Sequence, residues 1–335
     1  ALCGSLAAVS AANAGAMSVS GSASMTWLSL DEETTGNPLG IATGLTFSGA
    51  GELDNGSTFT VSIAHTHKNV YSVSNVSITT PTLGTFQYDE GGGTGLDRID
   101  DMMPTAWEES TGTGVASGLR TVAGAGGSTD IEWSVGSGML PDGMNAYISW
   151  NPHPDGSKNS KKVASGDNGD TGVNNGDGWD VVLTHSGLAD GLNVFAGYSN
   201  IDQVSNLGDR EQHAIGLTYA IGGVTVGYQK SVDRTPGVAG DSTDAYSNNA
   251  WGVSFAVNDD FTISYGAHES TKSRANGTET GNNLDITTET KSFQASYTMG
   301  GASIVFAESE VDNKLYATTA ASQREGRTIA LTLAF

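Results

Sequence analysis

Carboxylates gathered in one stretch of the sequence are the side chains with the clearest chemical potential. Residues 95–109 read GLDRIDDMMPTAWEE and contain Asp97, Asp100, Asp101, Glu108 and Glu109. Acidic side chains crowded onto one segment attract cations, most strongly where the segment borders a confined, water-filled space. The chemistry that this pattern favours is electrostatic selection of ions.

Apolar side chains in the same stretch indicate that the acids are held in place. Met102, Met103, Pro104 and Trp107 separate the two acidic groups. A loop as long as residues 91–127 is usually either functional or disordered, and buried apolar residues favour the first. We predict that this loop packs against a wall and turns its acids toward a lumen, whereas the alternative is a surface loop with hydrated acids.

A second acidic loop could bind calcium. Residues 165–180 read SGDNGDTGVNNGDGWD, and Asp167, Asp170 and Asp177 offer the hard oxygen ligands that calcium prefers. The spacing does not match a calcium-binding helix-loop-helix motif, so a solvated, turn-rich loop is the simpler alternative. Calcium is the one ion that the sequence suggests, and no cofactor is required.

The histidines and glycines do not form an active-site pattern. None of the six histidines stands in a nucleophile elbow or a metal motif. His65 and His67 would share one face of a strand and could chelate a metal, although an interfacial pair is the simpler interpretation. The sequence GGGTG at 91–95 lacks the lysine and the helix of a phosphate loop. We predict that the chain is not an enzyme.

Charge and hydropathy exclude two further classes. The 335 residues include 37 acidic and 15 basic side chains, a net charge of −22, which is the opposite of a nucleic-acid-binding footprint. No stretch approaches the roughly 18 consecutive apolar residues of a spanning helix. A membrane barrel remains possible because its strands place apolar residues only at alternate positions.

Alternation of apolar and polar residues supplies the elements that would position the acids. In residues 17–27, MSVSGSASMTW, apolar side chains share one face and serines share the other. The alternation recurs so often that one closed sheet, apolar outside and polar inside, is the economical solution. We predict an all-β, transmembrane antiparallel barrel of about sixteen strands, at residues 17–27, 41–50, 57–66, 71–79, 82–90, 129–136, 144–151, 179–186, 192–200, 211–220, 224–232, 250–257, 261–269, 290–298, 302–310 and 326–335.

The first sixteen residues differ from the rest. They read ALCGSLAAVSAANAGA, are uncharged, and offer small-x-small cleavage patterns ending at Ala14 and Ala16. We interpret residues 1–16 as the end of a signal peptide that is removed, leaving residues 17–335 as a single barrel domain. Cys3, the only cysteine, falls in the removed part, so the mature chain would form no disulfide.

Three features together carry a family resemblance. They are the early hairpin GLTFSGAGELDNGSTFTVSIA at 44–64, the strand LGTFQYD at 83–89 that leads into the acidic loop, and the ending TIALTLAF, which closes on Phe335. The chain resembles the general diffusion porins of Gram-negative bacteria, in particular the alphaproteobacterial trimeric type. This resemblance implies a homotrimeric passive channel for small hydrophilic solutes and ions across the outer membrane.

The resemblance also assigns residue roles and partners. The third loop, 91–127, would fold into the barrel and constrict the pore with its five acids and with Arg98 and Arg120. The partners implied are outer-membrane lipid, lipopolysaccharide, and the barrel assembly machinery, which would bind the C-terminal strand ending at Phe335.

One departure from the family concerns charge. Related porins place basic residues opposite the acidic loop, but here few basic residues fall at inward positions, with Arg98, Arg120 and Arg324 as candidates. We therefore predict a cation preference. A solute-specific outer-membrane channel and a secreted β-rich adhesin or surface-layer protein are the alternatives.

Overall fold

The segments with alternating apolar and polar side chains form sixteen β-strands, and these strands make one closed barrel. The computed structural model describes residues 17–31, 36–67, 73–90, 92–127, 129–152, 154, 175–203, 208–235, 244–274 and 285–335. The strands are β1 (Ser18–Leu30), β2 (Leu39–Glu52), β3 (Thr58–Thr66), β4 (Val73–Thr80), β5 (Gly84–Asp89), β6 (Asp130–Val135), β7 (Met144–Asn151), β8 (Asn175–Ser186), β9 (Leu192–Gln203), β10 (Arg210–Ile221), β11 (Val224–Thr235), β12 (Asp244–Ala256), β13 (Phe261–Arg274), β14 (Ile286–Met299), β15 (Ala302–Asp312) and β16 (Arg324–Ala334).

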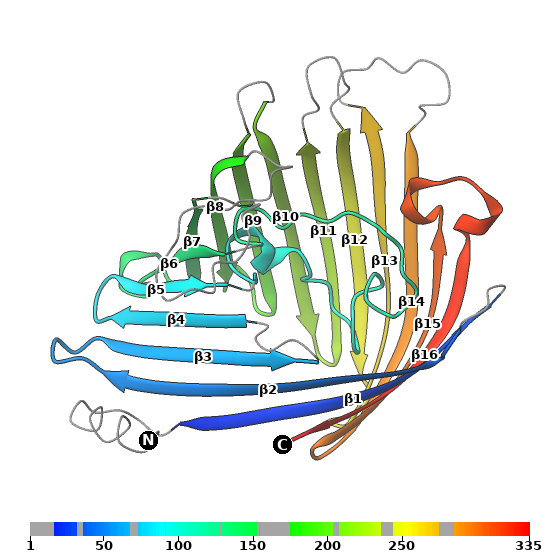
Figure 1. The fold of residues 1–335 in the computed structure, drawn as a ribbon, viewed down its shortest axis with the longest axis horizontal. Helices are drawn as coiled ribbons and strands as arrows, with labels where there is room; N and C mark the ends of the chain where they lie inside the picture. Colours follow the sequence, from blue (N-terminus) through cyan, green and yellow to red (C-terminus); the bar gives the residue numbers. More distant parts are fainter. Residues whose placement is uncertain are drawn as a thin grey trace.

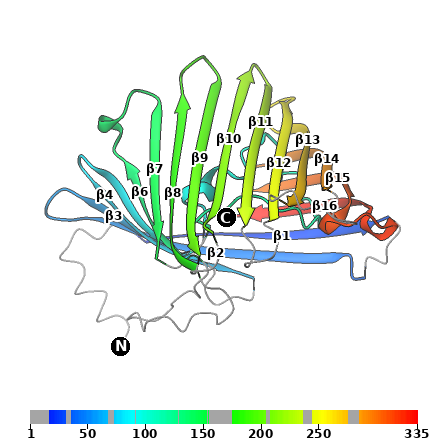
Figure 2. The same cartoon turned by 90° about the horizontal axis from the view of Figure 1, so that it is seen from above.

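Each strand pairs antiparallel with the strands before and after it in the sequence, and the last strand pairs with the first. In the closing pair Trp27 lies opposite Ile329 and Met25 opposite Leu331. The ring of strands is visible from two directions (Figures 1 and 2). Closure leaves no unpaired edge strand among the sixteen, which matters because an open edge invites pairing with other chains.

The two faces of the wall have opposite polarity. Large apolar side chains point outward and are exposed, as with Ile41 (67% exposed) and Phe47 (41%) on β2. Thr46 and Ser48, on either side of Phe47, point inward, and the Ser48 hydroxyl lies 3.1 Å from that of Ser62 on β3. An apolar outside and a polar inside suit a wall surrounded by lipid that encloses water.

Helical structure is confined to four short 3₁₀ helices within the described residues. They are η1 (Gly95–Ile99), η2 (Ser137–Met139), η3 (Lys314–Tyr316) and η4 (Ala320–Ser322). Among the residues that the structure describes, none forms a helix long and apolar enough to cross a membrane.

The strands predicted from alternation are all present, including the least regular one, predicted at 71–79 and observed as Val73–Thr80. Several strands are longer than predicted at the end away from the short turns. Thus β12 begins at Asp244 and not at residue 250, because its first six residues, DAYSNN, are mostly polar and hide the alternation. The predicted signal peptide, residues 1–16, lies outside the described residues.

Candidate functional site: the internal loop

The loop after β5 runs inside the barrel, as predicted from its apolar content. Its backbone meets the inner wall at successive strands: Gly95 N–H donates to Glu132 on β6 (2.7 Å), and Ala106 N–H donates to Ser264 on β13 (2.8 Å). Farther on, the Thr328 hydroxyl of β16 donates to the Thr113 carbonyl (2.6 Å). The loop therefore crosses most of the wall before it returns to β6, and its trace lies within the ring of strands (Figures 1 and 2).

Asp180 of β8 fastens the two ends of the loop together. Its fully buried carboxylate accepts the backbone N–H groups of Leu96, Ala125 and Gly126, each at 2.9 Å. These three donors come from the outgoing and the returning limbs, so one side chain closes the neck of the loop. Hydrogen bonds from N–H groups to a carboxylate are stronger than those between neutral groups.

Apolar side chains hold the loop against the wall. Leu96, Ile99 and Val122 are almost fully buried and form one cluster with Val182 of β8 and Phe195 of β9. These loop residues were not among those singled out in the sequence, although Leu96 and Ile99 have the three-residue spacing of one face of a 3₁₀ helix.

The apolar residues predicted to pack against the wall are buried there to different extents. Met103 is 7% exposed and belongs to the same cluster, whereas Trp107 is only half-buried. Pro104 rests on two glycines of the wall: a Cβ at Gly227 would lie 2.5 Å from Pro104 Cδ, and one at Gly252 would lie 2.7 Å from the Pro104 carbonyl oxygen. Glycine is needed at these two positions because the loop backbone approaches the strands so closely.

The five predicted acids lie on the inner part of this loop, in two arrangements. Asp101 and Glu108 are exposed inside the barrel. Asp97, Asp100 and Glu109 are half-buried, and two of them accept backbone hydrogen bonds: Asp97 from Gly93 (2.7 Å) and Glu109 from Met103 (2.9 Å). The hydrogen bonds fix the position of the inner acids, while the exposed ones face the solvent of the lumen.

Burial and mutual repulsion disfavour the charged forms of these acids. Burial, with the charges of Asp97, Asp101 and Glu109, raises the pKa of Asp100 to about 8. Burial also raises the pKa of Glu109 to about 7, against the opposing effect of its hydrogen bond from Met103. Because these pKa values lie near neutrality, the charge of the loop depends on pH in the physiological range.

The two predicted basic residues are paired with acids of the wall. Arg98 forms an ion pair with Glu132 and lies 4.1 Å above the centre of the Tyr147 ring. Arg120 donates to Asp233 of β11 at 2.6 Å and to Thr235 at 3.1 Å.

A third arginine in this network was missed in the sequence. Arg210 donates to both carboxylate oxygens of Asp233, at 2.9 Å each. The predicted strand began at residue 211, which left Arg210 in a loop, whereas β10 begins at Arg210 itself. Two arginines thus converge on one buried carboxylate.

The wall formed by β1 to β5 carries no basic side chain, since these five strands contain no lysine or arginine. Their inward positions are mostly hydroxyl and small residues, and hydroxyl groups bond across neighbouring strands, as Thr60 does with Ser77 and Thr79 with Thr85. The absence of basic side chains holds for these five strands, whereas Arg210 of β10 and Lys272 of β13 face inward on the opposite part of the wall.

The predicted calcium site is only partly covered by the described residues. Asp167 and Asp170 lie outside them, and Asp177 accepts a hydrogen bond from Trp150 Nε1 at 3.1 Å. Within the described ranges, no cluster of three or more His, Cys, Asp or Glu side chains could hold a metal. His65 and His67 do not share a strand face, because β3 ends at Thr66 and His67 has a left-handed φ of 55°.

A closed barrel of sixteen antiparallel strands with a long loop packed inside defines the porin fold class, and comparison with solved structures agrees. OmpF of Salmonella typhi, in complex with daunomycin, aligns with a TM-score of 0.67 at 14% identity, over 95% of this chain and 97% of that one. An anion-selective porin from Comamonas acidovorans gives 0.66 at 11% identity, over 96% and 99%. The trimer form of OmpT, an outer membrane protein of Vibrio cholerae, gives 0.66 at 9% identity, over 96% and 100%.

At the level of sequence, no family model and no curated protein matches this chain. The similarity to solved porins is one of fold, extending over almost the whole of each chain. Because identities are this low, charge and side-chain identity in the lumen must be read from this chain itself.

Proposed function

We propose that this protein is a passive diffusion channel for small hydrophilic solutes and ions in a Gram-negative outer membrane, with a preference for cations. The observation that carries the proposal is the charge inside the barrel. Acidic side chains of the internal loop face the lumen, while β1 to β5 supply no lysine or arginine to oppose them.

The two arginines of the loop do not form ion pairs with the acids of the loop. Arg98 forms an ion pair with Glu132, whereas Arg120 and Arg210 share the carboxylate of Asp233, so both loop arginines are held by acids of the wall and not by acids of the loop. Asp101 and Glu108 are left to set the local potential in a confined aqueous space, where acidic side chains favour cations. The constriction is thus assigned to Asp97, Asp100, Asp101, Glu108 and Glu109, with Arg98 and Arg120 as structural members.

Location in the membrane is supported by the outer face of the wall. Apolar side chains cover it from strand to strand, and the polar groups of the backbone are paired around the ring. Only helices and closed barrels satisfy their backbone within lipid. We also propose a homotrimer, in line with the trimer form of the Vibrio cholerae protein that shares the fold.

Planar-bilayer recording tests the proposal. Purified, folded protein should insert as an open channel, and a KCl gradient at pH 7.4 should give a reversal potential on the cation-selective side. A reversal potential of the opposite sign would contradict the cation preference, and absence of conductance from folded protein would contradict the channel itself.

Two variants connect the selectivity to the loop. Asp101→Asn with Glu108→Gln removes the two exposed acids, and each charge is worth about 1 kcal/mol to a nearby cation, so the permeability ratio should fall about fivefold per charge. Asp54→Asn, in the exposed turn between β2 and β3, is the matched control and should leave the ratio unchanged.

A further inference from the structure

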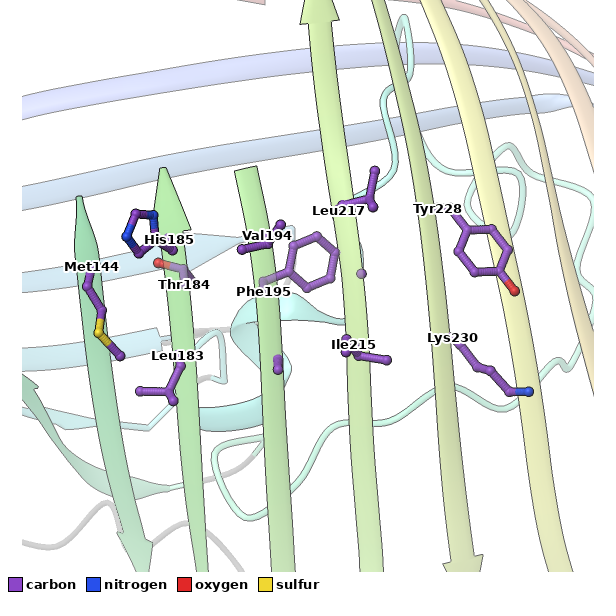
Figure 3. Close-up of a pocket in the computed structure, with 12 residues that line it drawn as sticks. Met144, Leu183, Thr184, His185, Val194, Phe195, Ile215, Leu217, Tyr228 and Lys230 are labelled. Carbon is purple, nitrogen blue, oxygen red and sulfur yellow. The ribbon is translucent and has the colours of Figure 1, made fainter. Parts of the chain in front are cut away.

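Three basic side chains gather inside the barrel, although the chain as a whole is strongly acidic. Arg210 of β10 and Lys272 of β13 face the lumen, and Arg120 of the internal loop contacts β11 and β12, the two strands between them. The alternation along the strands agrees with this orientation, because Ile215 and Lys230 in Figure 3 belong to the opposite, outward row of β10 and β11. We call Arg120, Arg210 and Lys272 the basic cluster.

Asp233 offsets one of the three positive charges. This carboxylate is fully buried, and it accepts hydrogen bonds from Arg120 Nε at 2.6 Å and from Arg210 Nε at 2.9 Å. Two guanidinium groups on one carboxylate leave an excess of one positive charge, to which Lys272 adds another. Both arginines keep access to the lumen, since 36% of the Arg120 side chain and 21% of the Arg210 side chain are exposed. The basic cluster can therefore attract an anionic group of a solute.

Tyr246 of β12 holds two members of the basic cluster in place. It lies opposite Lys272 in the strand register, and the centre of its ring is 4.8 Å from Arg120 Cζ and 5.8 Å from Lys272 Nζ. The Tyr246 side chain is buried, and Tyr316 packs edge-on against its ring with the ring centres 5.3 Å apart. Cations over an aromatic ring lose less freedom when they bind a ligand than cations on free stems do, which favours binding.

The basic cluster and the acids of the loop are separated along the strands and not only across the lumen. On β11, Gln229 Nε2 donates to the carbonyl groups of Ile99 (3.0 Å) and Asp100 (3.3 Å), so Gln229 marks the level of this acidic segment. Asp233 lies four residues farther along the same strand, roughly 13 Å at ~3.3 Å per residue. Because β11 starts at its short turn, a solute from the long-loop side meets the basic cluster first and the acids afterwards.

We propose that the lumen binds short zwitterionic solutes, above all peptides of about three residues, by both ends. The basic cluster binds the carboxylate of the peptide, and the ammonium group lies toward Asp101, which is exposed in the lumen. Three extended residues span about 10 Å, and the side chains of the two sites cover the remaining distance. A simple ion uses one of the two sites, whereas a zwitterion of this length uses both.

This inference rests on the proposed channel function and names a class of solute for it. Current recording in a planar bilayer with three related peptides on both sides of the membrane tests it. Tri-alanine carries both terminal charges, tri-alanine amide lacks the carboxylate, and N-acetyl-tri-alanine lacks the ammonium group. From the concentration dependence of the current noise, tri-alanine should bind about fivefold more tightly than either capped peptide, the gain expected for one solvent-exposed ion pair.

Two variants connect the preference to the basic cluster. Lys272→Met and Arg210→Gln each remove one positive charge, and tri-alanine should bind to each variant about fivefold more weakly. Binding of tri-alanine amide should not fall, because this peptide has no carboxylate to lose a partner. Lys230→Met is the matched control, since Lys230 is a lysine on the outer wall of the neighbouring strand β11 (Figure 3), and it should bind all three peptides normally.

Each outcome decides for or against the site. A preference for tri-alanine that is lost in Lys272→Met and kept in Lys230→Met would support it, and Lys272→Met decides alone if Arg210→Gln does not fold. Equal affinity for the three peptides, or equal affinity of the two lysine variants for tri-alanine, would overturn it. The channel proposal is judged separately, by conductance and reversal potential in KCl without peptide, and these can hold when peptide binding fails.

Discussion

Removing the carboxylate that closes the neck of the internal loop should change how the channel conducts. Asp180→Ala deletes the acceptor of three backbone N–H groups, from Leu96, Ala125 and Gly126, in a site with no solvent exposure. Breaking a buried charged network of this kind costs about 3–5 kcal/mol, because the orphaned donors cannot reach water without moving. The ratio of docked to undocked neck should therefore fall by about two to four orders of magnitude.

The rest of the loop limits the effect to the neck. Gln212 of β10 accepts the N–H groups of Ala123 (3.0 Å) and Gly124 (2.6 Å), and the distal part keeps its bonds to β13, β14 and β16. We therefore expect a folded barrel whose neck opens and closes, seen as a higher mean conductance, larger current noise and faster proteolytic cleavage between residues 92 and 127.

Single-channel recording and limited proteolysis of purified trimers or monomers measure both effects. Asp190→Ala, in the exposed turn between β8 and β9, is the control for loss of an aspartate on the same strand pair. If Asp180→Ala folds with normal heat stability yet shows the conductance, noise and cleavage rate of the control, the assignment of Asp180 as the closing residue is refuted.

Three further predictions follow from the loop and the last strand. Because burial and neighbouring acids raise the pKa of Asp100 to about 8 and of Glu109 to about 7, cation preference should increase as pH rises from 6 to 9. Reversal potentials in a pH series measure this, and values that stay constant from pH 6 to 9 would contradict it. Gly227→Val places methyl groups where Pro104 rests, so the loop should move into the lumen and lower single-channel conductance with little change in selectivity; a normal conductance would exclude the close contact. Deleting Phe335, whose side chain is 79% exposed and whose backbone pairs with Gly21, should reduce the amount of barrel in the outer membrane severalfold, as judged by heat-modifiable mobility of membrane fractions, if the assembly machinery binds this end.

The architecture of this protein was readable from sequence because lipid and lumen impose opposite demands on successive residues. A strand such as β2, LGIATGLTFSGAGE, carries its outward apolar and inward polar residues in plain alternation. The signal fades where strands extend beyond the apolar band, since both faces are then wet. This explains why the first half of β12 could not be assigned before the structure was known.

The internal loop was predictable in kind but not in detail. Its length and apolar content indicated that it packs inward, but its main anchors depend on partners 34 to 215 residues away, such as Glu132 for Arg98 and Thr328 for Thr113. A single inward aspartate on a strand looks like any other polar lumen residue. Which acids would face the solvent and which would be held by N–H groups could be decided only in three dimensions.

The way in which the basic residues of the loop are paired bears on the proposed cation selectivity. The chain has 15 basic residues against 37 acidic ones, and the loop uses two of the basic residues as ties to the wall. Arg98 holds the outgoing limb to β6, and Arg120, together with Arg210, converges on Asp233 of β11 at the returning limb. A guanidinium suits this role because its planar donors bind a carboxylate in fixed geometry. These ion pairs involve acids of the wall and not those of the loop. The same pairs that hold the loop in the barrel therefore leave Asp101 and Glu108 free to act on passing ions.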